Sequence, residues 1–142
     1  MKVIIVGSGR VGCAVAQKLY ADGYEVAVID KNPVSFERLG ENSGISMILG
    51  TGIDYDILES AGIREADALL SLTNGDNTNI MVAQIAQNIF GVKKVIARIV
   101  DLRVKRFYEE EMGLTCYCHT EVSSEHYLSM LKGVDTVCTS LS

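Results

Sequence analysis

The sequence predicts an α/β fold in which six parallel strands form a doubly wound sheet, and three observations support this. Short apolar runs alternate along the chain with longer amphipathic segments, the pattern of repeated strand–helix–strand units. A glycine-rich loop directly follows the first apolar run. The length of 142 residues and a hydrophobic content of 48% suit one globular domain with a single core.

Six short apolar runs are predicted to be strands. They are residues 2–6, 25–29, 46–49, 68–72, 94–99 and 115–118. The first contains four consecutive β-branched residues and is followed by glycine, as in a buried strand. Right-handed crossovers between parallel strands predict the strand order 3-2-1-4-5-6, with helices on both faces.

The amphipathic segments between these runs are predicted to be helices. They are residues 10–21, 33–41, 54–61, 76–90, 102–111 and 123–131. Gly23, Gly62, Gly91 and Gly113 stand where four of them should stop, and Pro33 stands at the start of another.

Apolar spacing predicts which helical side chains face the sheet. They are Val11, Ala14, Val15 and Leu19 in the first helix, Phe36 and Leu39 in the second, Ile57 and Leu58 in the third, and Ile80, Ala83, Ile85 and Ile89 in the fourth. No strand follows the last helix to return it to the sheet. Its face with Tyr127, Leu128 and Leu131 therefore needs a partner.

Composition argues against several classes of protein. A net charge of −5 disfavours nucleic acid as a partner, because phosphate binding requires a clustered basic face. The longest apolar runs fall far short of a membrane-spanning helix, so no direct membrane insertion is expected. Glycines from position 7 interrupt the amino-terminal apolar stretch, which argues against a signal peptide and favours a cytoplasmic location.

The four cysteines, Cys13, Cys116, Cys118 and Cys138, are expected to be free thiols. The spacing of Cys116, Cys118 and His119 differs from the separated ligand pairs of structural zinc sites. We favour the interpretation that Cys116 and Cys118 lie on one face of a short strand, and no metal is expected. Cys13 is read as a small packing residue rather than a redox group, and no catalytic constellation is found.

Residues 7–12 read Gly-Ser-Gly-Arg-Val-Gly, a G-x-G-x-x-G loop between a strand and a helix. Gly7 permits the tight turn, Gly9 lets the backbone approach a pyrophosphate, and Gly12 lets the helix pack closely on the sheet. The helix amino terminus then presents free N–H groups to phosphate. This arrangement predicts a Rossmann-type nucleotide-binding domain.

Asp30 ends the second strand, 18 residues after Gly12. Its carboxylate would accept hydrogen bonds from the adenosine ribose and repel a 2′-phosphate, which favours NAD over NADP. Lys31 would partly offset that repulsion. Alternatively, the glycines serve only turns and Asp30 caps the next helix. We favour nucleotide binding because strand, glycines, helix and acid stand in register.

Residues 72–79 follow the fourth strand, at the edge where doubly wound sheets bind ligands. Thr73 and Asn74 offer hydrogen bonds to phosphate or ribose. Asp76 or Asn77 would also serve as the amino-terminal cap of the long helix, and both roles remain open.

Arg98 ends an otherwise apolar strand, where an arginine is costly to bury without a partner. At the carboxyl edge its guanidinium would bind phosphate oxygens as a fork. The alternative is a salt bridge to Asp76 or Asp101.

Taken together, these residues resemble the amino-terminal lobe of RCK or KTN (TrkA-N) domains, NAD-binding TrkA-like subunits that regulate potassium uptake systems and channels. The motifs are the glycine loop, Asp30, Thr73-Asn74-x-Asp76-x-x-Asn79, Arg98 and the ending Gly113…His119-Thr120-Glu121. The resemblance covers residues 1–135. It implies a Rossmann lobe over residues 1–118, then a crossover helix and tail over 119–142. Full subunits of the family usually carry a carboxyl-terminal lobe after the crossover helix, and the expectation that this chain has no such separate lobe departs from the family pattern.

The resemblance also implies roles for single residues. Phosphate contacts would come from Gly7, Ser8, Gly9, Arg10 and Val11, ribose contacts from Asp30 and Lys31, and the crevice lining from Thr73, Asn74 and Asp76. Arg98 would reach the distal phosphates or a neighbouring subunit's ligand. Glu121 resembles an acid that helps some relatives hold a divalent cation between subunits. Thr51 stands where the family often has an aspartate near adenine, so it keeps a hydrogen-bonding group without the charge.

The implied function is that of a cytoplasmic regulatory subunit at the inner face of the cell membrane, not an enzyme. It would bind NAD, NADH, ATP, ADP or AMP and assemble with itself through residues 119–135. By ligand-dependent rearrangement it would control ion flux through an integral-membrane potassium transporter or channel subunit. One alternative is the NAD-binding domain of an oxidoreductase whose substrate groups come from a partner chain. Another is a redox sensor of transcription, but 142 residues leave no room for a DNA-binding module.

Overall fold

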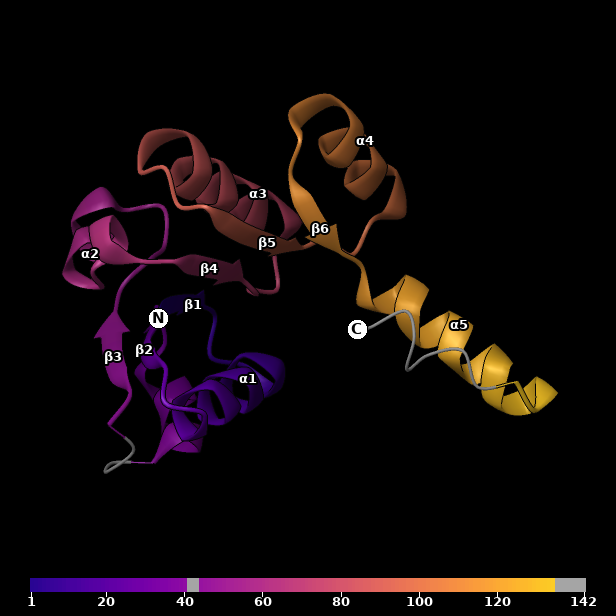
Figure 1. Ribbon diagram of the computed structural model, residues 1–142, viewed down its shortest axis with the longest axis horizontal. Helices are drawn as coiled ribbons and strands as arrows, with labels where there is room; N and C mark the ends of the chain where they lie inside the picture. The colour runs from indigo at the N-terminus through magenta and orange to yellow at the C-terminus, as the bar shows by residue number, and fades with distance from the viewer. Residues whose placement is uncertain (41–43, 135–142) are drawn as a thin grey trace.

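The computed structural model describes residues 1–40 and 44–134. Within them six parallel strands form one sheet in the order β3-β2-β1-β4-β5-β6, which confirms the predicted topology (Figure 1). The strands are β1 (Lys2–Val6), β2 (Glu25–Asp30), β3 (Ser46–Leu49), β4 (Ala68–Ser71), β5 (Lys94–Arg98) and β6 (Thr115–Tyr117).

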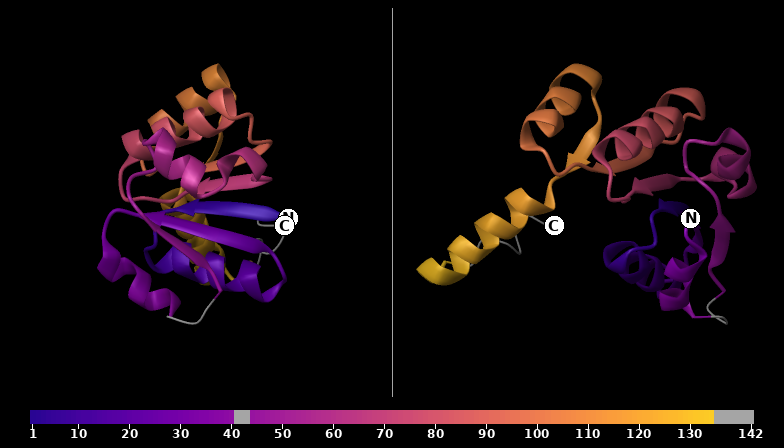
Figure 2. Two further views of the ribbon diagram at one scale, coloured as in Figure 1. Left: turned by 90° about the vertical axis from the view of Figure 1, so that its left-hand side faces the viewer. Right: turned by 180° about the vertical axis from the view of Figure 1, so that it is seen from behind.

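Helices cover both faces of this sheet. They are α1 (Arg10–Ala21), α2 (Tyr55–Ser60), α3 (Asp76–Gln84), α4 (Leu102–Met112) and α5 (His119–Lys132), with 3-10 turns η1 (Pro33–Leu39) and η2 (Ile63–Glu65) and a π-helical turn η3 (Ile85–Ile89). Figure 2 shows α1 and η1 in one layer and α2, α3 and α4 in the other. The five connections between the strands therefore build a three-layer sandwich, whereas α5, which follows the last strand, lies outside it.

The register of the central strands brings three strand ends together. Val6, the last residue of β1, pairs with Ile29 of β2 and with Ser71 of β4. The strand order reverses between β1 and β4, so the segments that leave β1, β2 and β4 diverge around one crevice.

The core lies on both sides of β1. Ile4 and Ile5 are both fully buried although they point to opposite faces. Ile4 belongs to the apolar cluster under α2 and α3, and Ile5 to the cluster under α1 and η1. This double burial explains why the run is apolar without alternation.

The predicted inner face of α1 is partly wrong. Val11 and Ala14 are exposed, and the buried residues are Gly12, Cys13 and Ala16. A Cβ on Gly12 would collide with the carbonyl oxygen of Gly7, so the start of α1 lies too close to the end of β1 for a side chain at this position. Val15 and Leu19 pack at the periphery of this contact, as expected.

The helix predicted over residues 76–90 is regular only as far as Gln84. The π-helical turn η3 continues it to Ile89, and the wider turn shifts the helical phase. Ile80, Ala83 and Ile85 are buried as predicted, but Ile89 is 54% exposed.

Two other predicted helices differ at their ends. The segment predicted over 33–41 is the 3-10 turn η1 as far as Leu39, and residue 41 lies outside the described residues. The last helix starts at His119 rather than at residue 123, because its first turn is polar and carries no apolar periodicity.

The helix α5 projects away from the sandwich (Figure 1). None of its residues is buried, and Tyr127, Leu128 and Leu131 are 73%, 51% and 84% exposed. The prediction that this face lacks a partner in the lobe is confirmed. The tail beyond, with Cys138, lies outside the described residues. Among the helices of residues 1–40 and 44–134, none is long and apolar enough to cross a membrane.

Candidate functional site

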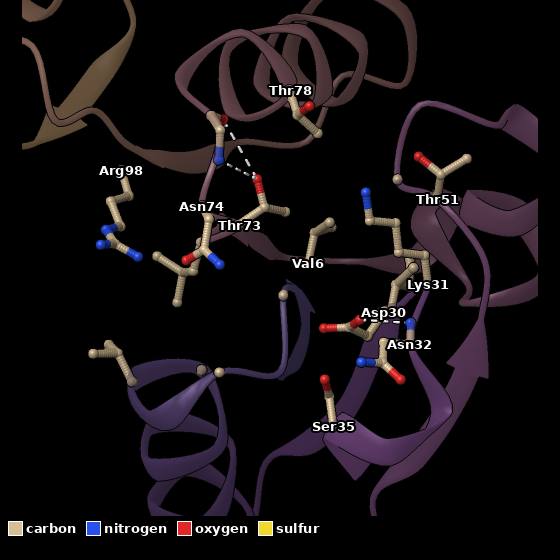
Figure 3. Close-up of a pocket in the computed structure, with 18 of the residues that line it drawn as sticks. Val6, Asp30, Lys31, Asn32, Ser35, Thr51, Thr73, Asn74, Thr78 and Arg98 are labelled. Atoms are coloured by element: carbon tan, nitrogen blue, oxygen red, sulfur yellow. Dashed lines mark hydrogen bonds between the residues drawn. The ribbon is translucent and has the colours of Figure 1, made fainter.

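A cavity of about 860 Å³ opens at the carboxyl ends of β1, β2 and β4. Its walls are the glycine loop with the start of α1, the end of β2 with η1, the β3–α2 loop, the β4–α3 loop and the end of β5 (Figure 3). This volume lies within the range of small-molecule sites, and the position is the topological switch point of the sheet.

The three glycines of the loop have different reasons to be glycine. Gly7 has a φ of +109°, and a Cβ there would lie 2.8 Å from the backbone of Leu72. Gly12 packs against the Gly7 carbonyl. Gly9 lines the cavity with a φ of −70°, and a Cβ added to it would meet nothing within 4 Å. Neither strain nor packing in the chain therefore explains Gly9, whereas an incoming ligand would.

Gly9 is also the N-cap of α1, and no side chain caps that end. The first-turn N–H groups of the helix and its partial positive charge therefore face the cavity without a side-chain acceptor. Such an end is suited to bind an anion.

Ser8 does not line the cavity, contrary to the phosphate contact implied for it. It is fully buried, and its N–H and its hydroxyl both donate to Asp30 Oδ2 over 2.8 Å. The other carboxylate oxygen of Asp30 accepts the N–H of Asn32 over 2.8 Å. Asp30 thus fixes the glycine loop through Ser8, and Asp30 itself also lines the cavity. Asn32, not Asp30, caps η1, so the alternative capping role for Asp30 is wrong.

The environment of Asp30 keeps it ionised. Partial burial acts to raise the pKa of the carboxyl, but the hydrogen bonds from Ser8 and Asn32 and the nearby Lys31 ammonium outweigh burial. The pKa of Asp30 therefore lies below its usual value. An ionised carboxylate retains lone pairs for further donors such as ribose hydroxyls.

Basic side chains surround the cavity. Arg10, Lys31, Arg38 and Arg98 line it, against Asp30 as the one carboxylate among its lining residues. Figure 3 shows Arg98 and Lys31 on opposite sides, with the glycine loop between them. This excess of positive charge occurs in a chain whose net charge is −5. The local field therefore favours an anionic ligand.

Arg38 was missed by the sequence prediction. It lies in η1, and its Nη1 donates to the Ser8 carbonyl oxygen over 3.4 Å. The only available signal was a basic residue in the segment after the second strand. Other lining residues that were not predicted include Asn32, Ser35, Gly50, Gly52, Ile53 and Thr78.

Asn79 joins two walls of the cavity. It is buried, and its Oδ1 accepts the N–H and the hydroxyl of Thr73 over 2.8 and 2.7 Å and the Ser71 hydroxyl over 3.2 Å. Its Nδ2 donates to the carbonyl oxygens of Thr73 and Arg98 over 3.0 and 2.8 Å. Asn79 thereby ties the β4–α3 loop to the end of β5. Sequence reasoning quoted Asn79 in a motif but gave it no role.

Thr73 and Asn74 both line the cavity, as predicted. The Thr73 hydroxyl donates to Asn79 Oδ1 over 2.7 Å and accepts the Gly75 N–H over 3.3 Å. Asn74 is exposed and faces the open side. Asn74 is therefore the freer of the two to contact a ligand.

Asp76 lies outside the cavity lining, contrary to expectation. Its carboxylate accepts the N–H groups of Val100 and Asp101 over 2.8 and 3.1 Å. Asp76 does not cap α3 either, because Gly75 is the N-cap of this helix. Asn77, the other candidate for the cap, lies inside the helix. Asp76 instead fixes the loop that follows β5.

Arg98 lines the cavity from the end of β5, half-buried, as predicted. The alternative salt bridge to Asp76 or Asp101 is wrong: within the described residues Arg98 forms no ion pair. Its Nε instead lies 3.3 Å from Nδ1 of His119, the first residue of α5.

Thr51 lines the cavity from the β3–α2 loop, where the resemblance places it. The loop reaches this position because Gly52 lies against β1: a Cβ on Gly52 would be 2.7 Å from Cγ1 of Val6. Thr51 is exposed and offers a hydroxyl at this rim.

Three cysteines of the described residues, Cys13, Cys116 and Cys118, do not line the cavity, and neither does Glu121. Cys13 is buried and donates to the Ser8 carbonyl oxygen, and burial raises its thiol pKa, which fits a packing residue. Burial raises the pKa of Cys116 to about 11. Glu121 Oε2 lies 3.3 Å from Lys105 Nζ. Among residues 1–40 and 44–134, no group of three His, Cys, Asp or Glu side chains is placed to hold a metal ion.

Comparison with known sequences gives one family. The model of the TrkA-N domain matches residues 3–137. A Trk system potassium uptake protein TrkA from Streptomyces coelicolor is 48% identical over 109 residues, which cover 77% of this chain and 49% of that protein. A TrkA homolog from Pyrococcus abyssi is 35% identical over 125 residues, which cover 88% of this chain and 55% of that protein. The chain thus spans about half the length of these curated relatives.

Solved structures share the fold. The TrkA-N domain of the inner membrane protein ybaL from Escherichia coli matches with a TM-score of 0.79 and 23% identity, over 92% of this chain and 96% of that one. A Kef CTD from Shewanella denitrificans in its AMP-bound form matches with a TM-score of 0.76 and 22% identity, over 98% of this chain and 86% of that one.

Proposed function

This chain belongs to the TrkA-N domain family, and from that premise we propose that it is a nucleotide-binding regulatory subunit of a potassium uptake system. The observation that carries the proposal is the cavity at the glycine loop. Its rim carries Arg10, Lys31, Arg38 and Arg98 beside a helix amino terminus that no side chain caps. Phosphate groups are the ligands that such an arrangement favours.

The ligand we propose is an adenine nucleotide, either NAD(H) or one of ATP, ADP and AMP. Gly7, Gly9, Arg10 and Val11 would surround the phosphates, with Ser8 acting through Asp30 rather than directly. Asp30 and Lys31 would contact the ribose, and Thr51 would lie towards the base. The Kef CTD from Shewanella denitrificans, which shares the fold, was solved in an AMP-bound form, and this supports a mononucleotide as one candidate.

We infer that the lobe senses its ligand and catalyses nothing. The residues that line the described cavity include no histidine, cysteine or tyrosine. Asp30, its one carboxylate, is held ionised and bonded to Ser8 and Asn32, which makes it a poor proton donor. An oxidoreductase would therefore need its acid and base from another chain.

The partners we propose are a second copy of this chain and an integral-membrane potassium transporter or channel subunit. The exposed apolar face of α5 supports assembly through residues 119–135. The names of the curated relatives support the membrane partner. The subunit would then act in the cytoplasm at the inner face of the membrane. A ligand regulates such an assembly only if it binds two arrangements with different affinity.

A thermal-shift panel with NAD, NADH, ADP, ATP and AMP tests the binding step. A ligand at 100 times its Kd stabilises the fold by about 2.7 kcal/mol, which corresponds to roughly 5–10 °C in a domain of this size. We expect such a shift with at least one nucleotide. The absence of any shift, in protein shown to be free of bound nucleotide, would overturn the proposal.

Solution scattering tests the regulatory step separately. We expect the scattering profile of the assembly to differ between nucleotides that bind with similar affinity. Identical scattering profiles with every bound ligand would show that nucleotide binding to this lobe does not change the arrangement of the subunits.

A further inference from the structure

Arg98 is held at two points, one on its backbone and one on its side chain. Asn79 Nδ2 donates to its carbonyl oxygen over 2.8 Å, and its own Nε faces His119 Nδ1 over 3.3 Å. An arginine Nε carries a proton at all physiological pH values and donates only. His119 Nδ1 is therefore the acceptor, which requires a neutral imidazole with its proton on Nε2.

This contact leaves the rest of the guanidinium free. Of the five N–H groups of an arginine, one points to His119 and four remain on the two terminal nitrogens. Arg98 lines the cavity, so those nitrogens are the ones available to phosphate oxygens. A long side chain fixed at Nε loses less rotational freedom on binding than a free one.

We propose that His119 is a positioning residue for the nucleotide site: its neutral Nδ1 orients Arg98 towards the ligand phosphates, and uptake of a proton by His119 releases Arg98 and weakens binding. The inference rests on the proposed nucleotide-binding function and adds to it a residue of α5 that does not line the cavity. Histidine is the side chain suited to this role, because imidazole changes charge between about pH 5 and 8.

The other charged groups near the first turn of α5 are already engaged in ion pairs or in hydrogen bonds from backbone N–H groups. On the side of α4, Lys105 Nζ lies 3.2 Å from Glu109 and 3.3 Å from Glu121 of α5. In the loop after β5, Asp101 caps α4, and Asp76 accepts two backbone N–H groups of that loop. Arg98 is thus the charged group in contact with His119. Protonation would remove the acceptor and place a second cation beside the guanidinium.

The chain offers matched variants for a test. His119→Asn keeps an acceptor oxygen near the place of Nδ1 but does not titrate. His119→Leu removes the acceptor. The second histidine, His126, lies exposed on the same helix, so His126→Asn is the control. Circular dichroism and thermal melts of each variant separate misfolding from a binding effect.

Calorimetric titration with ADP, and with adenosine as a phosphate-free comparison, gives the affinities at about pH 8 and about pH 5.5. At the higher pH we expect His119→Leu to weaken the binding of ADP by about three- to tenfold, the loss typical of one hydrogen bond. His119→Asn and His126→Asn should stay within about twofold of wild type. Adenosine should be unaffected by all three.

At the lower pH the wild-type affinity for ADP should fall relative to that of His119→Asn, and His126→Asn should follow the wild type. Comparison at equal pH removes the effect of protonating the nucleotide itself. Parallel pH profiles of wild type and His119→Asn would overturn the inference. The inference would also be overturned if His119→Leu weakened ADP binding equally in the wild-type and the Arg98→Gln backgrounds. A residue that acts only by positioning Arg98 should have no effect once that arginine is absent.

Nitrogen NMR of the free protein provides a readout that needs no ligand. We expect His119 to show an unprotonated Nδ1 at about pH 8, with a chemical shift that changes on Arg98→Gln while that of His126 does not. An unchanged His119 signal would overturn the inference. If the wild type binds no nucleotide but its His119 signal responds to Arg98→Gln, the contact stands and the proposed function fails.

Discussion

Both donors of Ser8, its backbone N–H and its hydroxyl, point to the same oxygen of Asp30, each over 2.8 Å. The carboxylate at the end of β2 therefore determines the shape of the loop after β1. These two parts of the candidate site, which are 22 residues apart in the chain, thus form one hydrogen-bonded unit. A substitution of Asp30 should consequently lower the stability of the fold as well as the affinity for a ligand.

Asp30→Asn is the first prediction. The amide keeps an acceptor for Ser8 but loses the charge, and we expect a loss of unfolding free energy of about 1–3 kcal/mol together with weaker nucleotide binding. Chemical denaturation and calorimetry measure the two effects. Asp22→Asn, at the exposed end of α1, is the control and should be within about 0.5 kcal/mol of wild type. Wild-type stability in Asp30→Asn would show that the loop does not depend on the carboxylate.

Asp30→Asn also tests how the stability contributed by Asp30 depends on pH. The pKa of Asp30 in the fold lies below the ordinary value of 3.8. A carboxyl with a lowered folded-state pKa contributes its full stability above that ordinary value and loses it as pH falls through the folded-state pKa. The stability difference between wild type and Asp30→Asn should therefore be constant from about pH 7 to 5 and shrink below about pH 4. A difference that grows on acidification would contradict this.

Gly9→Ala separates architecture from binding. The added methyl group would meet nothing within 4 Å, and the extended backbone conformation of Gly9 suits any residue. The free energy of unfolding should therefore fall by only about 0.5–1 kcal/mol, because alanine is a poorer helix cap than glycine. The same methyl group projects where a pyrophosphate would approach, and affinity for ADP or NAD should fall more than tenfold, on the order of 1.4 kcal/mol or more. Thermal melts and calorimetry test both parts. Unchanged affinity would mean that the ligand does not contact this loop.

Asn79→Ala should be among the most damaging changes of a polar residue. It would leave the Thr73 N–H and the Arg98 carbonyl oxygen without their buried partner, at a cost of about 1–3 kcal/mol for each unsatisfied group. Asn77→Ala, exposed in the first turn of the same helix, should change the unfolding free energy by less than about 0.5 kcal/mol. Urea denaturation of the pair measures the difference, and equal effects would show that Asn79 contributes no more than a surface residue.

The sequence predicted the sheet order and the position of the cavity because both follow from local patterns. Apolar runs of four or five residues mark buried strands, and G-x-G-x-x-G marks a turn with a helix behind it. What it missed depends on contacts between distant segments. The burial of Ser8, the pairing of Arg98 with His119 and the presence of Arg38 in the cavity wall arise from the tertiary arrangement, and no spacing encodes them. The error at Ile89 is different, because a π-helical turn breaks the period on which the prediction relied.

The last prediction concerns α5. Leu128 and Leu131 are 51% and 84% exposed on a helix that the sandwich does not cover. If this face assembles with a second copy, Leu131→Asp would place a charge in an apolar interface, and removal of its buried side chain alone would cost about 1.5–3 kcal/mol per subunit. We expect the sedimentation coefficient at a fixed concentration to fall from that of a dimer or larger assembly towards that of a monomer. Glu111→Gln, exposed on α4 and outside the segment 119–135, is the control and should leave assembly unchanged. A wild type that sediments as a monomer at tens of micromolar would contradict assembly through this helix while leaving nucleotide binding untouched.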